Sequence, residues 1–66
     1  MKLTVNGEEH QFDGEMSIST LLEHFQLNPQ QVAVELNRHI VKKPDYQTTA
    51  LKHGDVLEVV HFVGGG

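Results

Sequence analysis

Residues 54–66 read GDVLEVVHFVGGG, and this stretch decides both the fold and the function that we expect. It opens on the turn pair Gly54-Asp55 and continues into the most β-prone segment of the chain, Val56–Val63. Nothing in that segment breaks β structure before the three terminal glycines, which are half of the six glycines in the chain. The sequence therefore predicts a last strand that leads directly into a glycine tail.

The residues before this strand predict a hairpin and a helix. Asn6-Gly7 tolerates the positive φ angles of a tight turn between two strands. Ser17 can cap the helix, and Asn28-Pro29 should end it because the residue before a proline avoids the helical region. The predicted elements are strands at Lys2–Val5 and His10–Asp13, and a helix whose apolar face carries Ile18, Leu21, Leu22 and Phe25.

Two further strands, Val32–Leu36 and His39–Val41, flank a predicted turn at Asn37-Arg38, and Pro44 favours a loop or a short 3₁₀ turn after them. One helix cannot cover both faces of a sheet. We therefore expect an α+β fold in which the helix packs on one face of a mixed sheet of four or five strands. The domain should span residues 1–63, and a flexible tail should span residues 64–66.

Composition narrows the classes of function. The 66 residues carry nine acidic and five basic side chains, and the net charge of −4 disfavours nucleic acid and anionic membranes as partners. The chain has no cysteine for a disulfide or a thiol nucleophile, and its apolar runs are too short to span a bilayer. We expect a cytoplasmic protein without a bound metal, because no metal-ligand spacing links the five histidines, which are His10, His24, His39, His53 and His61.

The glycine tail has a chemical interpretation. Without Cβ atoms, Gly64, Gly65 and Gly66 form the thinnest and most pliable peptide, which can enter a narrow channel. Such a tail can present its α-carboxylate to another protein's active site, where attack on the α-phosphate of ATP makes an acyl-adenylate. The simpler alternative is a frayed chain end. We expect the tail to be disordered in the free protein, because nothing after Val63 can pack.

The whole chain resembles a known family. The order of the elements, the segments Val34-Glu35-Leu36-Asn37 and Ile40-Val41, the turn at Gly54-Asp55 and the ending at residues 60–66 carry the resemblance. Together they are similar to the ubiquitin-like β-grasp family and, within it, to the sulfur carriers of the ThiS and MoaD type. Gly64 is an addition to the minimal Gly-Gly ending of these carriers.

The resemblance implies a role as a protein cosubstrate rather than a catalyst. A ThiF-type adenylyltransferase would use ATP to adenylate the carboxylate of Gly66, with Gly64 and Gly65 entering its active site. A sulfur donor, a cysteine desulfurase or persulfide, would then convert that carboxylate to a thiocarboxylate. A ThiG-type thiazole synthase would take the sulfur for thiamin biosynthesis. The resemblance implies no cofactor on the chain itself, and we expect the free protein to be a monomer.

The last strand also carries a candidate docking patch. If Leu57 and Val59 face the helix, Val60 and Phe62 lie on the opposite face together with Val56 and Glu58. That face of a small sheet with one helix should meet water, so we expect Phe62 and Val60 to dock a partner. The alternatives are that both residues pack under the loop at 42–51, or that the register differs by one residue.

Three other functions stay open at this stage. The chain could be the small subunit of molybdopterin synthase, although His61-Phe62-Val63 lacks the proline that those carriers often have before the glycines. It could be a ubiquitin-like modifier that is joined through Gly66 to a lysine. It could also be a non-covalent interaction module whose tail is incidental. The basic group Lys42, Lys43 and Lys52 belongs to a solvated loop or contacts an acidic partner.

Overall fold

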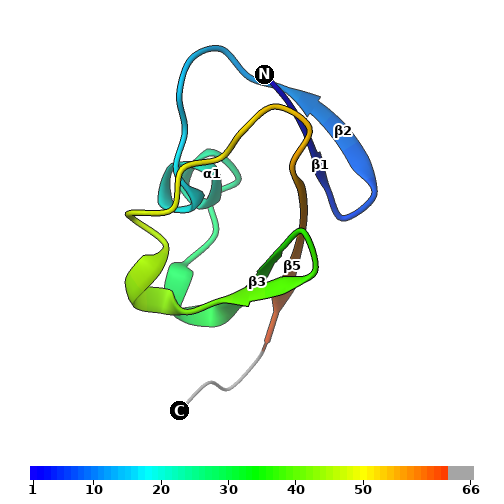
Figure 1. Ribbon diagram of the computed structural model, residues 1–66. Helices are drawn as coiled ribbons and strands as arrows, with labels where there is room; N and C mark the ends of the chain where they lie inside the picture. The colour runs from blue at the N-terminus through cyan, green and yellow to red at the C-terminus, as the bar shows by residue number, and fades with distance from the viewer. Residues whose placement is uncertain (63–66) are drawn as a thin grey trace.

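Within residues 1–62, five strands form one mixed sheet, and a single helix lies across one of its faces (Figure 1). The strand order is β2-β1-β5-β3-β4, so the last strand of the chain lies in the middle of the sheet, parallel to β1 and antiparallel to β3. The computed structural model describes residues 1–62. Its elements are β1 (Lys2–Val5), β2 (Glu8–Gln11), α1 (Ile18–His24), the 3₁₀ turn η1 (Pro29–Gln31), β3 (Val32–Leu36), β4 (His39–Val41), the 3₁₀ turn η2 (Lys43–Asp45) and β5 (Val56–His61).

The predicted α+β architecture is confirmed, and the two predicted hairpin turns are present. Asn6 and Gly7 have φ angles of 51° and 83°, and Asn37 and Arg38 have φ angles of 50° and 72°, as a two-residue turn between twisted strands requires. The predicted bounds of the second strand, His10–Asp13, were wrong. The two-residue turn pairs Val5 directly with Glu8, so β2 starts two residues earlier and ends before Phe12.

The helix starts as predicted and ends sooner. The Ser17 hydroxyl accepts a hydrogen bond from the N–H of Thr20 at 3.2 Å and so caps α1. The prediction that Asn28-Pro29 ends the helix was wrong, because Gln26 already takes a left-handed φ of 59° after the last helical residue, His24. Asn28 instead caps η1, since its Oδ1 accepts from the N–H of Gln30 at 2.9 Å.

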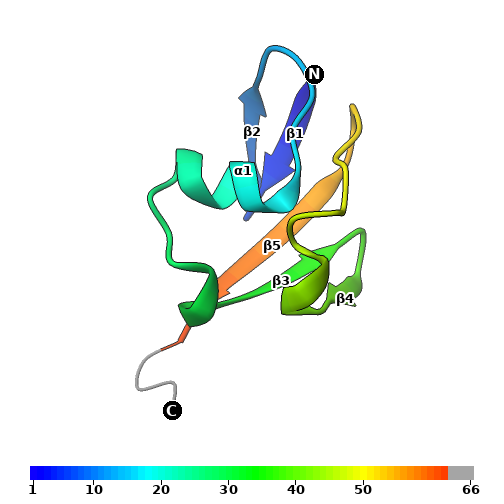
Figure 2. The same ribbon diagram turned by 90° about the vertical axis from the view of Figure 1, so that its left-hand side faces the viewer.

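The core lies between α1 and the sheet face that α1 covers (Figure 2). Tyr46 and Leu51, from the segment predicted as a loop, are also buried, and the Tyr46 hydroxyl donates to the carbonyl of Val32 at 3.2 Å. Pro44 lies in η2, which confirms the predicted short 3₁₀ turn. Within residues 1–62, no helix has both the length and the apolar character that crossing a membrane requires. The buried core residues are Leu3, Val5, Phe12, Ile18, Leu21, Leu22, Val32, Val34, Tyr46, Leu51 and Leu57.

Candidate functional site

The candidate site is the end of β5, where the chain leaves the sheet shortly before its C-terminus. The backbone N–H of Phe62 donates to the carbonyl of Gln31 at 3.0 Å, so η1 holds the last described residue against the start of β3 (Figure 2). The strand ends at His61, two residues short of the predicted end at Val63. Val63 and the predicted reactive tail, Gly64, Gly65 and Gly66, lie outside the described residues.

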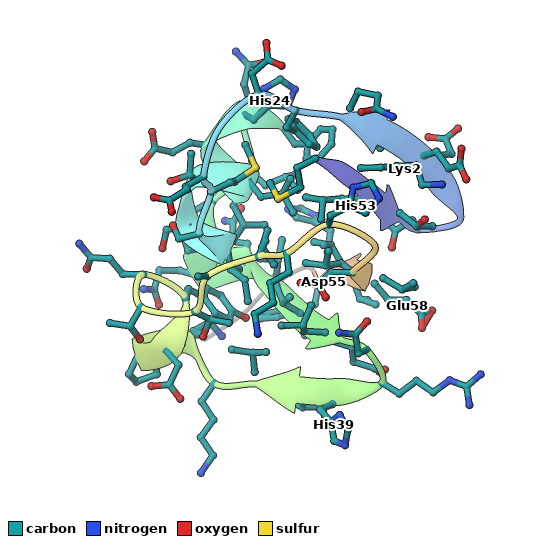
Figure 3. The ribbon with its side chains drawn as sticks, turned by 45° about the horizontal axis from the view of Figure 1, so that its top comes forward. Lys2, His24, His39, His53, Asp55 and Glu58 are labelled. Carbon is teal, nitrogen blue, oxygen red and sulfur yellow. The ribbon has the colours of Figure 1, made fainter. Side chains whose placement is uncertain are left out.

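The two faces of β5 divide as the alternation predicts. Leu57 is fully buried on the helix side, whereas Val56 and Val60 are 48% and 60% exposed on the other side. This second side, which we call the open face, also carries Glu58, whose side chain points outward (Figure 3). Val60 is therefore free to contact a partner, and its use as a docking residue stays a prediction.

Phe62 differs from Val60 although both are predicted docking residues. Its side chain is half-buried rather than exposed. The ammonium of Lys43, in η2, lies 5.0 Å from the centre of the Phe62 ring, at the distance of a cation–π contact. This contact corresponds in part to the alternative that the loop at 42–51 covers Phe62. Docking through Phe62 would have to include or displace Lys43, and it too stays a prediction.

The open face of the sheet mixes apolar and acidic side chains. Glu35 of β3 stands opposite Glu58 of β5 in the ladder, and Ile40 of the edge strand β4 stands opposite Glu35. Ile40 is 78% exposed. Like charges directly opposite each other weaken a sheet. Two surface hollows, of about 350 and 440 Å³, are both lined by residues other than Val60, His61 and Phe62.

His10 and His24 pack against the same two phenylalanine rings, and the other three histidines lie on other parts of the fold. His24 is at the end of α1, His39 is on β4, and His53 precedes β5 and accepts a hydrogen bond from the backbone N–H of Lys2 at 3.0 Å (Figure 3). His61 is exposed, as a histidine at a strand end is expected to be. Within the part of the chain that the structure describes, no three His, Cys, Asp or Glu side chains form a group that could hold a metal ion.

Two asparagine side chains form hydrogen bonds with the backbone of β5, one at its first residue and one at its fourth. Sequence reasoning missed both contacts. The Asn6 carboxamide pairs with the N–H of Val59 at 2.8 Å and with its carbonyl at 3.1 Å. The Asn37 carboxamide accepts from the N–H of Val56 at 3.0 Å and donates to the carboxylate of Asp55 at 3.0 Å. Each asparagine takes the first position of a two-residue turn, and this shared position is the one signal that could have singled them out.

Comparison with known proteins gives consistent matches. The model of the ThiS family matches residues 3–66. A protein of Bacillus subtilis named sulfur carrier protein ThiS is 40% identical over 65 residues, which are 97% of this chain and 98% of that protein. A crystal structure of the thiamine biosynthesis protein ThiS from Geobacter metallireducens superposes with a TM-score of 0.85 at 35% identity, and the match covers all of both chains.

A second kind of relative is much longer. A protein of Paramagnetospirillum magneticum named thiazole synthase is 46% identical over 66 residues, which are all of this chain but 20% of that protein. The chain therefore spans about one fifth of the length of this relative.

Proposed function

The chain belongs to the ThiS family, and from this premise we propose that it carries sulfur for formation of the thiazole of thiamin. The observation that carries the proposal is the match to the Bacillus sulfur carrier, which extends over nearly the full length of both proteins. The family match also favours the thiazole branch over the small subunit of molybdopterin synthase. A cytoplasmic location follows from this role as part of the proposal.

In the proposed reaction, the C-terminal carboxylate is the group that changes. An oxygen of the Gly66 carboxylate attacks the α-phosphorus of ATP on a ThiF-type adenylyltransferase, and pyrophosphate leaves. The outer sulfur of a persulfide, made by a cysteine desulfurase, then attacks the acyl carbon and displaces AMP, which gives an acyl disulfide. A thiol cleaves the S–S bond of this acyl disulfide, so the chain keeps the sulfur as a thiocarboxylate and the donor cysteine leaves in a disulfide with that thiol. Activation followed by displacement divides one difficult substitution into two easier ones. The chain itself binds no cofactor in this scheme, because the partner supplies ATP.

In this proposal, the domain binds the partner and the tail enters the partner's active site. Residues 1–63 form the part that partners grip, and Gly64 and Gly65 pass through the partner's channel because they lack side chains. Gly66 is the fourth residue after Phe62, so covalent geometry limits the distance between their Cα atoms to about 14 Å. A partner that binds the open face at Val60 is therefore also close to the carboxylate of Gly66 that reacts.

A ThiG-type thiazole synthase is the proposed acceptor of the sulfur. In the Paramagnetospirillum relative named thiazole synthase, the segment that matches this chain and the remaining four fifths belong to one polypeptide. This covalent association supports contact between the carrier and the synthase, because a tether raises their effective concentration without any new contact. We propose that the present chain, a monomer when free, makes the same contact from solution.

Intact-mass spectrometry tests the proposal. The chain is incubated with a ThiF-type adenylyltransferase, ATP and a cysteine desulfurase with cysteine, and its mass should rise by one oxygen-to-sulfur exchange. A variant that lacks Gly66 should show no change, because its carboxylate cannot reach the same position in the partner. An unchanged mass of the wild-type chain, with an adenylyltransferase that activates its own carrier in a parallel reaction, contradicts the proposal.

A further inference from the structure

The two edges of β5 are covered unequally. On one edge, β3 pairs with β5 along its length, from Leu57 to His61. On the other edge, β1 pairs only with Val56 and Leu57 (Figure 2). Among residues 1–62, no strand pairs with this second edge beyond Leu57, so the part of β5 nearest the C-terminus has a partner strand on the β3 side alone.

Asn6 closes part of this open edge with its side chain. The N–H and carbonyl of Val59 point toward β1, where the chain has already turned away, since Asn6 starts the turn with a φ of 51°. The Asn6 carboxamide accepts from the N–H of Val59 at 2.8 Å and donates to its carbonyl at 3.1 Å. A carboxamide has a donor and an acceptor side by side like a peptide group, so Asn6 replaces the missing residue of β1.

Beyond Val59, the support of β5 becomes one-sided. Phe62 is bonded to Gln31 on the β3 side, so the alternation of the ladder points the N–H and carbonyl of His61 toward the open edge. No residue that the structure describes lies in a strand next to His61 on that side. Among the described residues, the Asn6 contact is therefore the last hydrogen-bonded contact to β5 on this edge.

We propose that Asn6 is a positioning residue for the reaction of the C-terminal carboxylate. By fixing both polar groups of Val59, it holds β5 on the edge that β1 leaves uncovered, and so helps to set the position and direction of Phe62, the last described residue. Small displacements of a reacting group away from its partner cost large factors in rate. This inference rests on the proposed function and adds to it a residue that is distant from the tail in the sequence.

The chain contains a matched control for this residue. Asn37 has nearly the same backbone conformation as Asn6, with φ angles of 50° and 51°, and also starts a two-residue turn. Each side chain makes two hydrogen bonds, and each binds the backbone of β5. Asn37 holds Val56 at the start of the strand, whereas Asn6 holds Val59 near its end.

The experiment compares Asn6→Gly with Asn37→Gly. Glycine adopts the same positive φ angle, so each variant keeps its turn and loses two side-chain bonds. The melting temperatures should fall by similar amounts. Adenylation by a ThiF-type adenylyltransferase is measured through the pyrophosphate that it releases. In this assay, Asn6→Gly should lower kcat about tenfold or more without changing KM. Asn37→Gly should leave kcat and KM unchanged. Equal effects of the two substitutions on kcat would overturn the proposal.

A second variant and a second measurement decide the case where Asn6→Gly fails to fold. Asn6→Asp keeps a residue that favours the turn and keeps the acceptor for the Val59 N–H, but it places an oxygen against the Val59 carbonyl. Its kcat should also fall, and an unchanged kcat in a folded Asn6→Asp chain contradicts the proposal.

In the wild type, the amide hydrogen of Val59 should exchange more slowly than that of His61. Equal exchange of the two amides removes the structural premise, whereas a wild-type chain that is never adenylated contradicts only the proposed function.

Discussion

Val60 shows what a single side chain contributes to the proposed contact. Isolated apolar residues are common on protein surfaces and usually mean nothing. Val60 differs because it is 60% exposed on the open face of the strand that leads into the tail, one residue after the Val59 that Asn6 holds. In the proposed reaction, a partner that contacts this side chain acts on Gly66, six residues further along the chain.

Val60→Asp is expected to weaken docking without unfolding the protein. The KM for adenylation should rise about tenfold, since burying a carboxylate in an apolar contact is costly. The melting temperature should stay close to that of the wild type, because the side chain is exposed. Ile40→Asp is the control, since Ile40 is 78% exposed on the same face but lies on the edge strand β4. If both variants raise KM equally, added charge rather than docking explains the effect.

Residue-scale prediction from the sequence succeeded where the cause is local. Asn6-Gly7 and Asn37-Arg38 are recognisable as turns because the positive φ angles depend on these residues themselves. The contact between Asn6 and Val59 joins residues 53 positions apart and exists only because β5 lies beside β1. No pattern within the sequence carries that information.

At the scale of elements, the segment between β4 and β5 contributes side chains to the core as well as connecting the two strands. Tyr46 follows η2 and is buried, and its hydroxyl donates to the carbonyl of Val32 at 3.2 Å. The sequence predicts a loop or a short 3₁₀ turn here and does not mark Tyr46 and Leu51 as core residues, because one aromatic and one leucine in an irregular segment have no periodicity. The same segment carries Lys43, which lies over Phe62, so it links the core to the end of β5.

Tyr46→Phe should change the response of stability to alkaline pH. Burial raises the pKa of Tyr46 in the folded state above its ordinary value, so the folded protein holds the phenol proton more tightly than the unfolded chain. The resulting stabilisation is complete below about pH 10 and is lost as pH rises through the folded pKa. Tyr46→Phe should lower the free energy of unfolding by about 1 kcal/mol at neutral pH, because the bond to Val32 is lost. Above pH 10, the wild type should lose stability more steeply than the variant.

The measurement uses melting temperatures of both proteins across alkaline pH. Tyr46 is the one tyrosine of the chain, which has no tryptophan, so ultraviolet absorbance of tyrosinate reports its ionisation directly. Ionisation of Tyr46 in the folded protein at the pH of a free tyrosine speaks against the burial of its hydroxyl, as do identical alkaline slopes.

At the scale of the whole molecule, the topology places the last strand in the centre of the sheet. β5 has β1 on one side and β3 on the other, and its Leu57 is fully buried under α1. The alternation of the sequence predicted which face of β5 is buried, and the family resemblance predicted the fold. The central place of β5 could not be derived from local patterns, because it depends on pairing with β1 near the N-terminus and with β3 in the middle of the chain.

Leu57→Ala tests whether partners need the folded domain as well as the tail. Removing this much of a fully buried side chain costs about 2–5 kcal/mol. A single core in a domain this small supplies about 3–5 kcal/mol, so much of the variant should be unfolded at 25 °C. Adenylation should fall in proportion to the folded fraction measured by circular dichroism, although the carboxylate is chemically unchanged. Val56→Ala, at a half-exposed position on the same strand, should leave both quantities near the wild-type values.

The most direct test of the central claim is to locate the transferred sulfur on the chain. After incubation with a ThiF-type adenylyltransferase, ATP and a sulfur donor, the C-terminal peptide is isolated and fragmented in a mass spectrometer. We predict that one sulfur atom replaces one oxygen on Gly66 and on no other residue. Sulfur elsewhere on the chain, or none in a chain that the adenylyltransferase has adenylated, contradicts the claim that this protein carries sulfur on its C-terminal carboxylate.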